Sequence, residues 1–329
     1  MKVLYVAMEH DYGDPSRGQS FEETNFRSAL EGMGHNVVPF DFIARAKRDG
    51  KARMRADLIA AAQEGRPDVA FFTLYQDELD APTIEAVGKV CPTVNWFTDD
   101  HWRFDIFTRH IAGAFTLAVT TDADSLPKYA AAGLDRVHLS QWACNRYAYS
   151  KVSDTLEHGV TFVGQPHGGR GEIIDALRAA GIEVECWGHG WPAGKLHHDE
   201  MVRVFATSAV NLNLSNSGEP APTLRVRIGK LLGRGLGPKP PQIKGRNFEV
   251  PGCGGFLLTE RVSHLERYYA YDEEIGVHDD TDSLIERTRY WLDHPDECAA
   301  VAAAGYRRTL AEHTYDHRFA AIFESLRRA

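Results

Sequence analysis

The segment 242–259 combines residue types that suit a phosphorylated ligand. Lys244 and Arg246 supply positive charge, and a guanidinium group matches the geometry of a diphosphate. Glu249 can accept hydrogen bonds from a vicinal diol such as ribose. Two glycines that permit close backbone approach precede an apolar run: Gly254 and Gly255. Because a nucleotide sugar presents both a diphosphate and a diol, we predict that this segment binds one. The plainer alternative is a solvated loop with Glu249 near a helix start.

Two further loops follow predicted strands and could complete such a site. The first, Gly164 to Arg170, opens a helix, so its backbone N–H groups could form an anion nest that includes Gln165, with Arg170 adding charge. The second contains Trp187 and Gly188, whose backbone could meet the base of the nucleotide. The alternatives are an ordinary strand–helix turn and a tryptophan that only fills the core.

Candidate general bases follow two predicted strands of the N-terminal half. His10 and Asp11 come after a strand at 3–7, and Asp100 comes after a strand at 93–98. Either position could deprotonate an acceptor hydroxyl. Turn formation and helix capping compete as explanations at both places, and the sequence does not choose between the two sites. The neighbouring side chains that we predict to bind the acceptor are Tyr12, Arg17, Asp99, His101 and Arg103.

Strands and helices that must carry these loops alternate along the chain. Continuous apolar runs without period-two alternation predict parallel strands covered on both faces. In the N-terminal half we expect strands at 3–7, 36–40, 68–74, 93–98 and 115–120, with helices at 21–32, 81–89 and 125–132. The alternation of strands and helices begins again in the C-terminal half, with strands at 159–164, 183–187 and 210–214 and helices at 172–180 and 199–207. The prediction is an α/β protein with two Rossmann-like, doubly wound parallel-sheet domains that face a cleft.

Length and composition divide this pattern into domains. A chain of 329 residues exceeds what one hydrophobic core usually supports. We predict an N-terminal Rossmann-like acceptor domain at 1–147, a linker at 148–158 and a C-terminal Rossmann-like nucleotide-sugar donor domain at 159–312. Residues 313–329 are predicted to form a helix able to pack back on the first domain. The Gly-, Pro-, Lys- and Arg-rich residues 216–246 are predicted to form a long functional loop.

Composition limits the compartment and the partners. Hydrophobic residues make up 43% and charged residues 25%, and the net charge of −9 gives no global attraction to nucleic acid or anionic membranes. No apolar run reaches the length of a membrane span, and the first residues lack the plan of a signal peptide. The five cysteines are scattered and never spaced C-x-x-C, which favours the reducing cytoplasm. We expect a monomer or a homodimer.

Several motifs together resemble a known family. In the C-terminal half they are Phe162-Val-Gly164, Lys244-x-Arg-x-Phe-Glu249, Tyr268-Tyr269, Glu274-Ile275 and His313-Thr-Tyr-x-x-Arg318. This ensemble, spread over residues 160–320, resembles the spore-maturation (CgeB-like) glycosyltransferases, a branch of the two-domain GT-B superfamily. In the N-terminal half, Asn95-Trp-Phe-Thr-Asp-Asp100 and Thr120-Thr-Asp122 look like the companion domain of that group.

The resemblance implies a glycosyltransferase that moves a hexosyl or pentosyl group from a nucleotide-diphosphate sugar, with a UDP-sugar as the expected donor, to a hydroxyl acceptor. It implies donor binding by the C-terminal domain and acceptor binding by the N-terminal domain, without a further cofactor or a metal. Many retaining members carry two glutamates separated by seven residues. Glu249 fits the second position but Pro241 occupies the first, so retention or inversion stays open.

Two motifs bear on metal binding. Asp122-Ala-Asp124 spells the D-x-D that binds a divalent cation in single-domain (GT-A) glycosyltransferases, but here it precedes a predicted helix and is expected to cap it. The pair His197-His198 has no third ligand at useful spacing, so zinc is not expected. We therefore predict no metal site.

A basic run keeps nucleic acid open as an acceptor. The run 45–55 has six cations in eleven residues, and more cations follow at Arg225, Arg227, Lys230 and Arg234. Such a run is usually a solvated helix face, but it could grip the phosphates of DNA. Phage enzymes that glycosylate hydroxymethylated DNA bases share the GT-B architecture, so such a base is one option beside a glycan, a protein or a small molecule.

Two other functions remain as alternatives to glycosyl transfer. A nucleotide-sugar 2-epimerase with the GT-B fold would use the same donor site and would need no acceptor surface. A non-catalytic module that binds a nucleotide or nucleic acid would need the charged loops but no base.

Overall fold

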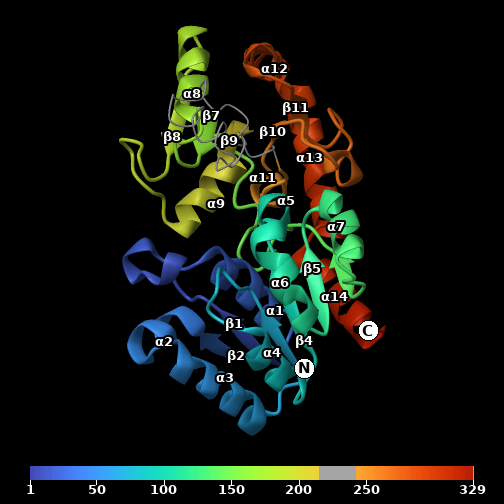
Figure 1. Ribbon diagram of the computed structural model, residues 1–329. Helices are drawn as coiled ribbons and strands as arrows, with labels where there is room; N and C mark the ends of the chain where they lie inside the picture. The colour runs from blue at the N-terminus through green and yellow to red at the C-terminus, as the bar shows by residue number, and fades with distance from the viewer. Residues whose placement is uncertain (215–241, 329) are drawn as a thin grey trace, which may run out of the picture. The chain divides into compact units, whose positions relative to one another are not determined.

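The computed structural model describes residues 1–214 and 242–328, and it divides the chain into two compact units. Unit 1 contains Met1–Ala148 and Tyr315–Ala329, and unit 2 contains Tyr149–Thr314. Each unit is built on one parallel β-sheet with helices packed on it (Figure 1). Most of the predicted loop 216–246, with Pro241 and the cations at 225–234, lies outside the described residues.

The sheet of unit 1 has six strands in the order β2-β1-β3-β4-β5-β6, and every neighbouring pair is parallel. The strands are β1 (Lys2–Ala7), β2 (Asn36–Asp41), β3 (Val69–Phe72), β4 (Thr93–Phe97), β5 (Leu117–Thr120) and β6 (Val137–Leu139). The first five lie at the positions that the apolar runs predict. The edge strand β6 was not predicted, because its three residues are only half-buried and form no apolar run.

Unit 1 surrounds this sheet with mostly short helices. They are α1 (Ser28–Gly32), α2 (Phe42–Asp49), α3 (Lys51–Gly65), α4 (Ala81–Gly88), α5 (Asp100–Arg103), α6 (Arg109–Ile111), α7 (Leu126–Ala131) and α14 (Tyr315–Arg328). Turns of 3-10 helix lie at Asp11–Gly13, Pro15–Arg17, Ala112–Ala114 and Ala123–Ser125, and π-helical turns lie at Glu23–Arg27 and Phe104–Thr108.

Alternation along β1 separates the core of unit 1 into two layers. Leu4 and Val6 join one hydrophobic cluster, while Val3 and Tyr5 join the other, on the opposite face of the sheet. The C-terminal helix α14 belongs to the second layer and packs near α1 and β5 (Figure 1). Its Phe319 ring lies 5.5 Å from the ring of Phe71 in β3, so the last helix is part of the core of unit 1.

The sheet of unit 2 has five strands in the order β11-β10-β9-β7-β8, again all parallel. The strands are β7 (His158–Val163), β8 (Val184–Trp187), β9 (Ser208–Asn213), β10 (Leu257–Glu260) and β11 (Gly276–His278). The helices are α8 (Arg170–Ala179), α9 (His198–Thr207), α11 (Arg246–Gly252), α12 (Thr281–Asp293) and α13 (Pro295–Glu312), with a 3-10 turn at Leu265–Arg267. Strand β11 is short and was not predicted.

Both strand orders place a topological switch point beside the first strand of the unit. In unit 1 the chain runs from β1 outward to β2 and then to β3 on the other side, and in unit 2 it does the same with β7, β8 and β9. Ligands of open α/β sheets bind at the carboxyl ends of the strands at such a point. The fold therefore directs attention to the loops after β1 and β3 and to those after β7 and β9.

One glycine of unit 2 is required by close packing. A Cβ atom on Gly255 would lie 2.0 Å from the carbonyl oxygen of Phe205, which is backbone and cannot turn aside. We expect Gly255→Ala to lower the free energy of unfolding by about 1–3 kcal/mol, because overpacking of this kind forces backbone shifts.

The matched control is Gly159→Ala, since Gly159 has a strand conformation and open space around its Cα. Urea unfolding of both variants measures the difference. Equal stabilities would show that the contact with Phe205 relaxes without cost.

Candidate functional site

Two guanidinium groups lie near each other at the carboxyl end of β7. Arg246 begins α11 and donates a hydrogen bond from Nη1 to the carbonyl oxygen of Val163, the last residue of β7. Arg170 begins α8 and donates from Nε to the carbonyl oxygen of Leu214, directly after β9, at 2.8 Å. The first residues of two helices from distant parts of the sequence therefore lie at the switch point of unit 2.

These two cations influence one another. The pKa of Arg170 is lowered mainly because the group is withdrawn from water, then because the positive charge of Arg246 lies near it, and Glu260 opposes the effect. Arg170 is held by carbonyl oxygens of Leu214 and Gln165, which carry no full negative charge. Such a pair leaves positive potential at the strand end and suits an anionic ligand with more than one negative oxygen.

Glu249 has a different environment from the one that the sequence suggests. Its side chain is only 4% exposed, and its Oε2 lies 3.2 Å from Nε of Arg246, one helical turn earlier. A buried carboxylate beside a guanidinium fixes that group in one orientation. The geometry therefore supports a positioning role for Glu249 on Arg246, while contact of Glu249 with a ribose stays a prediction.

A buried amide network, which sequence reasoning missed, fixes the start of α11. Asn213 ends β9 and donates to Oδ1 of Asn247 at 3.3 Å and to Oγ1 of Thr259 at 3.0 Å. Asn247 donates to the same Thr259 oxygen at 3.1 Å and accepts from the backbone N–H of Lys244 at 2.8 Å. The signal in the sequence is an asparagine at the end of an otherwise apolar strand. Lys244 and Arg246 are thus attached to the ends of β9 and β10.

The loop after β7 is held against the loop after β8. The carbonyl oxygen of Gly164 accepts a hydrogen bond from the indole of Trp191 at 2.7 Å, and its N–H donates to Trp187 at 2.8 Å. A Cβ on Gly188 would lie 2.3 Å from the Gly164 oxygen, so only glycine fits there. Gln165 follows Gly164 in this loop, and the loop leads through two glycines with positive φ into α8. The two loops form one rigid wall beside Arg170.

Three residues predicted to bind the donor lie elsewhere. Gly254 and Gly255 precede β10, so they lie at the amino edge of the sheet, opposite to Arg170 and Arg246. The ring of Trp187 packs 5.5 Å from His158, which begins β7, rather than toward the loop that follows that strand. The sequence shows that these residues flank strands, but it does not show which way they face. We do not assign them to the donor site.

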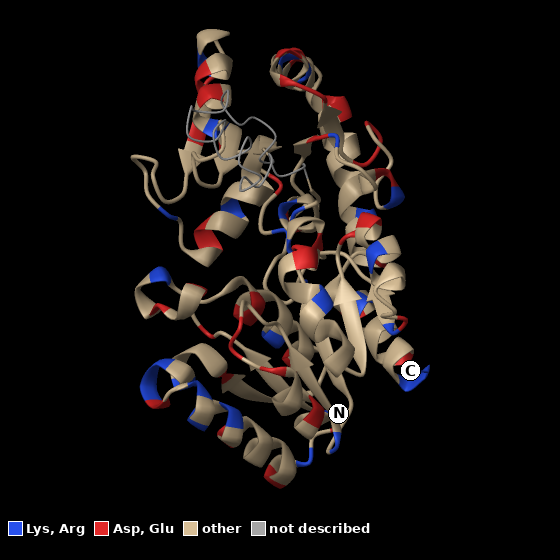
Figure 2. Cartoon of the chain, in the orientation of Figure 1, with Lys and Arg blue, Asp and Glu red and all other residues tan. Residues whose placement is uncertain are grey.

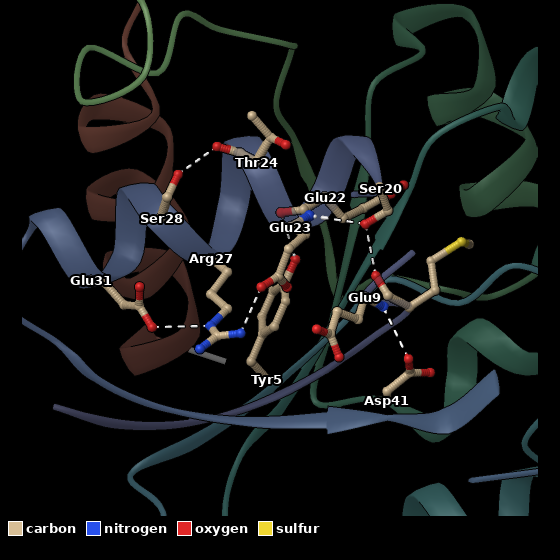
Figure 3. A network of polar contacts seen from close by, with 11 residues as sticks. Tyr5, Glu9, Ser20, Glu22, Glu23, Thr24, Arg27, Ser28, Glu31 and Asp41 are labelled. Carbon is tan, nitrogen blue, oxygen red and sulfur yellow. Dashed lines mark hydrogen bonds and ion pairs between the residues drawn. The ribbon is translucent and has the colours of Figure 1, made fainter. Parts of the chain in front are cut away.

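In unit 1, the loop after β1 is closed at its base by Ser20. The hydroxyl of Ser20 donates to the carbonyl oxygen of Met8 at 2.7 Å and accepts from the N–H of Glu23 at 3.0 Å (Figure 3). The N–H of Asp11 donates to Gly18 at 3.1 Å, and His10 pairs with Gln19 in an isolated bridge. The loop is therefore a small hairpin that presents residues 10–17 at the carboxyl end of β1.

Aromatic and charged side chains gather at the tip of this hairpin. Tyr12 is 50% exposed, and its ring makes an edge contact with Tyr75, which follows β3, at 5.4 Å. The guanidinium of Arg17 lies 4.7 Å above the Tyr12 ring and pairs with Asp11 at 3.0 Å. An exposed ring beside polar groups is suited to stacking on a sugar or another flat ligand. The structure thus brings together three of the predicted residues at the β1–β3 switch point.

His10 lies between two carboxylates. One ring nitrogen of His10 and one oxygen each of Glu9 and Asp41 all lie within 4.8 Å of one another. An imidazole nitrogen at a strand end can accept a proton from a hydroxyl group, as a general base requires. The same three groups are also the set of His, Cys, Asp and Glu side chains in the described residues that could hold a cation. Asp41 meanwhile accepts from Glu9 N–H and caps α2 (Figure 3).

Asp100 is buried and fully engaged. Its exposure is 0%, and its two oxygens accept hydrogen bonds from the hydroxyls of Thr108, Thr120 and Tyr129 at 2.6–2.7 Å. A base must reach its substrate, so this geometry favours a structural role and corrects the expectation for Asp100. The physical reason is that α5 turns the side chain inward, under α7.

Arg103 and His101, which we predicted to bind the acceptor beside Asp100, are also largely or partly buried. Arg103 is only 9% exposed and donates to the carbonyl oxygen of Tyr75, with its guanidinium 4.6 Å from the Phe107 ring. His101 is half-buried on α5, and Asp99 stands at the N-cap without a side-chain capping bond. Arg103 therefore contacts Tyr75, whose ring packs against the Tyr12 ring. Asp99 and Arg103 both line a shallow depression.

Glu22 is a polar residue of this region that the sequence did not single out. The pKa of its carboxyl is raised mainly by burial, and the negative charges of Asp11 and Asp99 add to the shift. Glu22 therefore lies near the hairpin after β1 and the loop after β4. A half-buried carboxyl with a raised pKa beside these two loops makes Glu22 a third candidate for proton transfer.

The basic run 45–55 is engaged within unit 1. Figure 2 shows lysines and arginines along α2 and the start of α3. Each of the six cations has a partner: Arg45 over the Phe40 ring, Lys47 on Gly13, Arg48 with Asp49, Lys51 with Asp77, Arg53 with Asp57 and Arg55 with Asp80. The run is therefore explained by local contacts: four ion pairs, one hydrogen bond to a carbonyl oxygen and one cation–π contact. Asp122 likewise caps the turn at Ala123–Ser125, by accepting from the N–H of Asp124.

Asp100 allows a test of pH dependence. Burial raises the pKa of its carboxyl, so the folded state binds this proton more tightly than the unfolded state. Relative to Asp100→Asn, the wild-type protein should gain unfolding free energy as the pH falls from 7 through the raised pKa, and the gain should level off below about 3.9, the ordinary value. Urea unfolding of both proteins across this range measures the difference. A relative loss of stability on acidification would contradict the burial argument.

Among the described residues, the structure contains no helix with the length and apolar character needed to cross a bilayer.

This chain is similar to several known proteins. Residues 170–324 match the family model described as glycosyl transferase-like. The spore protein CgeB of Bacillus subtilis strain 168 is 21% identical over 241 residues, which covers 70% of this chain and 73% of CgeB. The matched residues include Arg170, Arg246 and Glu249.

Solved structures share the fold along the whole chain. HepE from Anabaena, solved in complex with UDP and glucose, has a TM-score of 0.64 at 14% identity, with 100% of both chains covered. Sucrose-phosphate synthase from Thermosynechococcus elongatus has a TM-score of 0.64 at 10% identity, with 99% of both chains covered. The predicted α/β fold and the resemblance to the spore protein CgeB are therefore confirmed, and residues 170–324 match the glycosyl transferase-like family model.

Proposed function

We propose that this protein is a glycosyltransferase that uses a nucleoside-diphosphate sugar, with a UDP-sugar as donor, and transfers the sugar to a hydroxyl group. The observation that carries the proposal is the convergence of Arg170 and Arg246 at the carboxyl end of β7. The family match over residues 170–324 and the UDP complexes of HepE support it. The family match gives no support to DNA as acceptor, and the local pairing of the basic run removes one reason to expect it.

Unit 2 is proposed to bind the donor. In the transfer, the bond between the anomeric carbon and the diphosphate oxygen breaks, and negative charge grows on the departing diphosphate. Arg170 and Arg246 are held in place before the reaction, so they stabilise this charge without first having to reorient. Lys244 adds charge from the same loop, and Glu249 keeps Arg246 in position and offers a carboxylate to the ribose.

Donor binding can be tested with Arg246→Ala. We expect the affinity for UDP to fall at least tenfold, because a charge-assisted hydrogen bond contributes roughly 1.5–3 kcal/mol. The measurement is isothermal titration calorimetry with UDP, and the same loss should appear for Arg170→Ala.

Arg203→Ala is the matched control, because Arg203 is an exposed arginine of α9 that pairs with Glu157, just before the amino end of β7 and thus away from its carboxyl end. Unchanged UDP affinity in both Arg246→Ala and Arg170→Ala would remove the diphosphate from this position. A thermal-shift series with UDP, GDP and TDP then identifies the base of the donor.

Unit 1 is proposed to bind the acceptor and to accept its proton. As the new bond to the anomeric carbon forms, the acceptor hydroxyl must lose a proton. His10 is the residue best placed for this, because it lies at the β1 strand end between two carboxylates. The exposed ring of Tyr12, supported by Tyr75 and Arg17, offers a surface on which the acceptor can stack.

The role of His10 predicts a split between chemistry and binding. His10→Asn should lower kcat by about 10²–10⁴, the usual contribution of a general base, and leave the UDP affinity unchanged. His110→Asn is the control, because His110 is exposed on α6. UDP release in the presence of donor and an acceptor library measures kcat.

An unchanged kcat in His10→Asn would exclude this role and direct attention to Asp11 and Glu22. Incubation with the donor alone separates glycosyl transfer from epimerisation, since an epimerase would yield an isomeric sugar nucleotide without any acceptor.

A further inference from the structure

A second cavity lies on unit 2 at the edge of the sheet opposite to the proposed donor site. Its floor contains Ser208 and Ala209, which begin β9, and Gly254 to Phe256, which precede β10. Because all strands of this sheet are parallel, their amino ends lie at the edge away from Arg170 and Arg246. The cavity has a volume of about 350 Å³, which is within the range of small-molecule sites.

Small side chains on one face of α13 create this space. The lining positions of α13 recur every three or four residues, as one face of a helix does: Pro295, Cys298, Ala299, Ala302, Ala303, Tyr306 and Arg307. Three of them are alanines, so the helix leaves room between itself and the segment 151–156. We call this space the α13 pocket (α13 is labelled in Figure 1).

The body of the α13 pocket is apolar. Two leucines at its rim are exposed to solvent although they are large and apolar: Leu156 at 57% and Leu292 at 39%. On the floor, the Cys298 thiol donates to the carbonyl oxygen of Ala209 at 3.4 Å, and burial raises its pKa to about 12. The thiol is therefore neutral at physiological pH and adds no negative charge. Exposed apolar rims of this kind are typical of binding sites.

Among the described residues, one positive charge of the pocket has no ion-pair partner. Three charged side chains line it: Lys151, Asp154 and Arg307. Lys151 pairs with Asp154, while Arg307 is exposed and makes no ion pair with any residue that the structure describes. An occupant with an apolar body and one anionic group would match both the apolar walls and the charge at the rim.

We propose that the α13 pocket binds a small amphiphilic anion, with its apolar body between α13 and the segment 151–156 and its anionic head at Arg307. A fatty-acid carboxylate has this chemistry. The pocket is separate from the residues proposed to bind the donor, so this inference does not depend on glycosyl transfer.

The test uses the full chain and dodecanoate, below the concentration at which it forms micelles. Calorimetry should detect saturable binding of one dodecanoate per chain to the wild-type protein. Ala302→Trp should fill the cavity and weaken binding at least tenfold, and Ala299→Phe, at an exposed lining position, serves as a second filling variant. The thermal unfolding midpoint of each variant checks that it folds, and UDP affinity should stay unchanged in both.

The charge at the rim is tested separately. Arg307→Ala should weaken dodecanoate binding several-fold but leave binding of the neutral dodecanol unchanged, and Arg267→Ala, at an exposed site outside the pocket, should change neither. Absence of dodecanoate binding to the wild-type protein, or equal binding by folded filling variants, would overturn the proposal. A wild-type dimer in sedimentation that Ala302→Trp converts to monomer would also overturn it, because a second copy would then occupy the groove.

Discussion

Two positive charges close together at the end of a buried strand repel each other, and a bound anion relieves this repulsion. Arg170 and Arg246 form such a pair in unit 2. Arg170 is held by carbonyl oxygens and lies near Glu260, while Arg246 lies beside Glu249. Two guanidinium groups are therefore held at the carboxyl end of β7, beside the switch point of the sheet. In the proposed transfer the departing diphosphate gains charge, so guanidinium groups that are already held in place stabilise the transition state more than the bound donor.

Holding these cations in place requires a rigid support. The amides of Asn213 and Asn247 and the hydroxyl of Thr259 join the first turn of α11 to two strand ends. The indole of Trp191 fixes the carbonyl oxygen of Gly164 and with it the loop before α8. All these groups are buried or half-buried polar atoms that find partners, so they restrict the guanidinium groups without leaving unsatisfied donors. Support of this kind turns two flexible side chains into a preorganised site.

The two units use the same architectural rule for different chemistry. In unit 1 the carboxyl end of β1 carries a hairpin with an exposed ring at Tyr12 and an imidazole at His10, which suit a neutral acceptor and its proton. In unit 2 the carboxyl ends carry cations that suit a diphosphate. The amino edge of the unit 2 sheet contains the α13 pocket, whose walls are mostly apolar. The pocket differs in polarity from the carboxyl edge because small apolar side chains of α13 form much of its wall.

The sequence by itself determined the alternation of strands and helices, because the apolar runs of buried parallel strands and the amphipathic helices are local patterns. It also predicted Arg170 and Arg246 as donor-binding residues, because a cation beside a glycine-rich loop is a local pattern. Only the tertiary structure decided direction and burial. Asp100 follows a strand, where we expected a general base, yet its side chain is turned into the core. Such outcomes depend on contacts between residues far apart in the chain, such as Asp100 with Tyr129, and no local pattern encodes them.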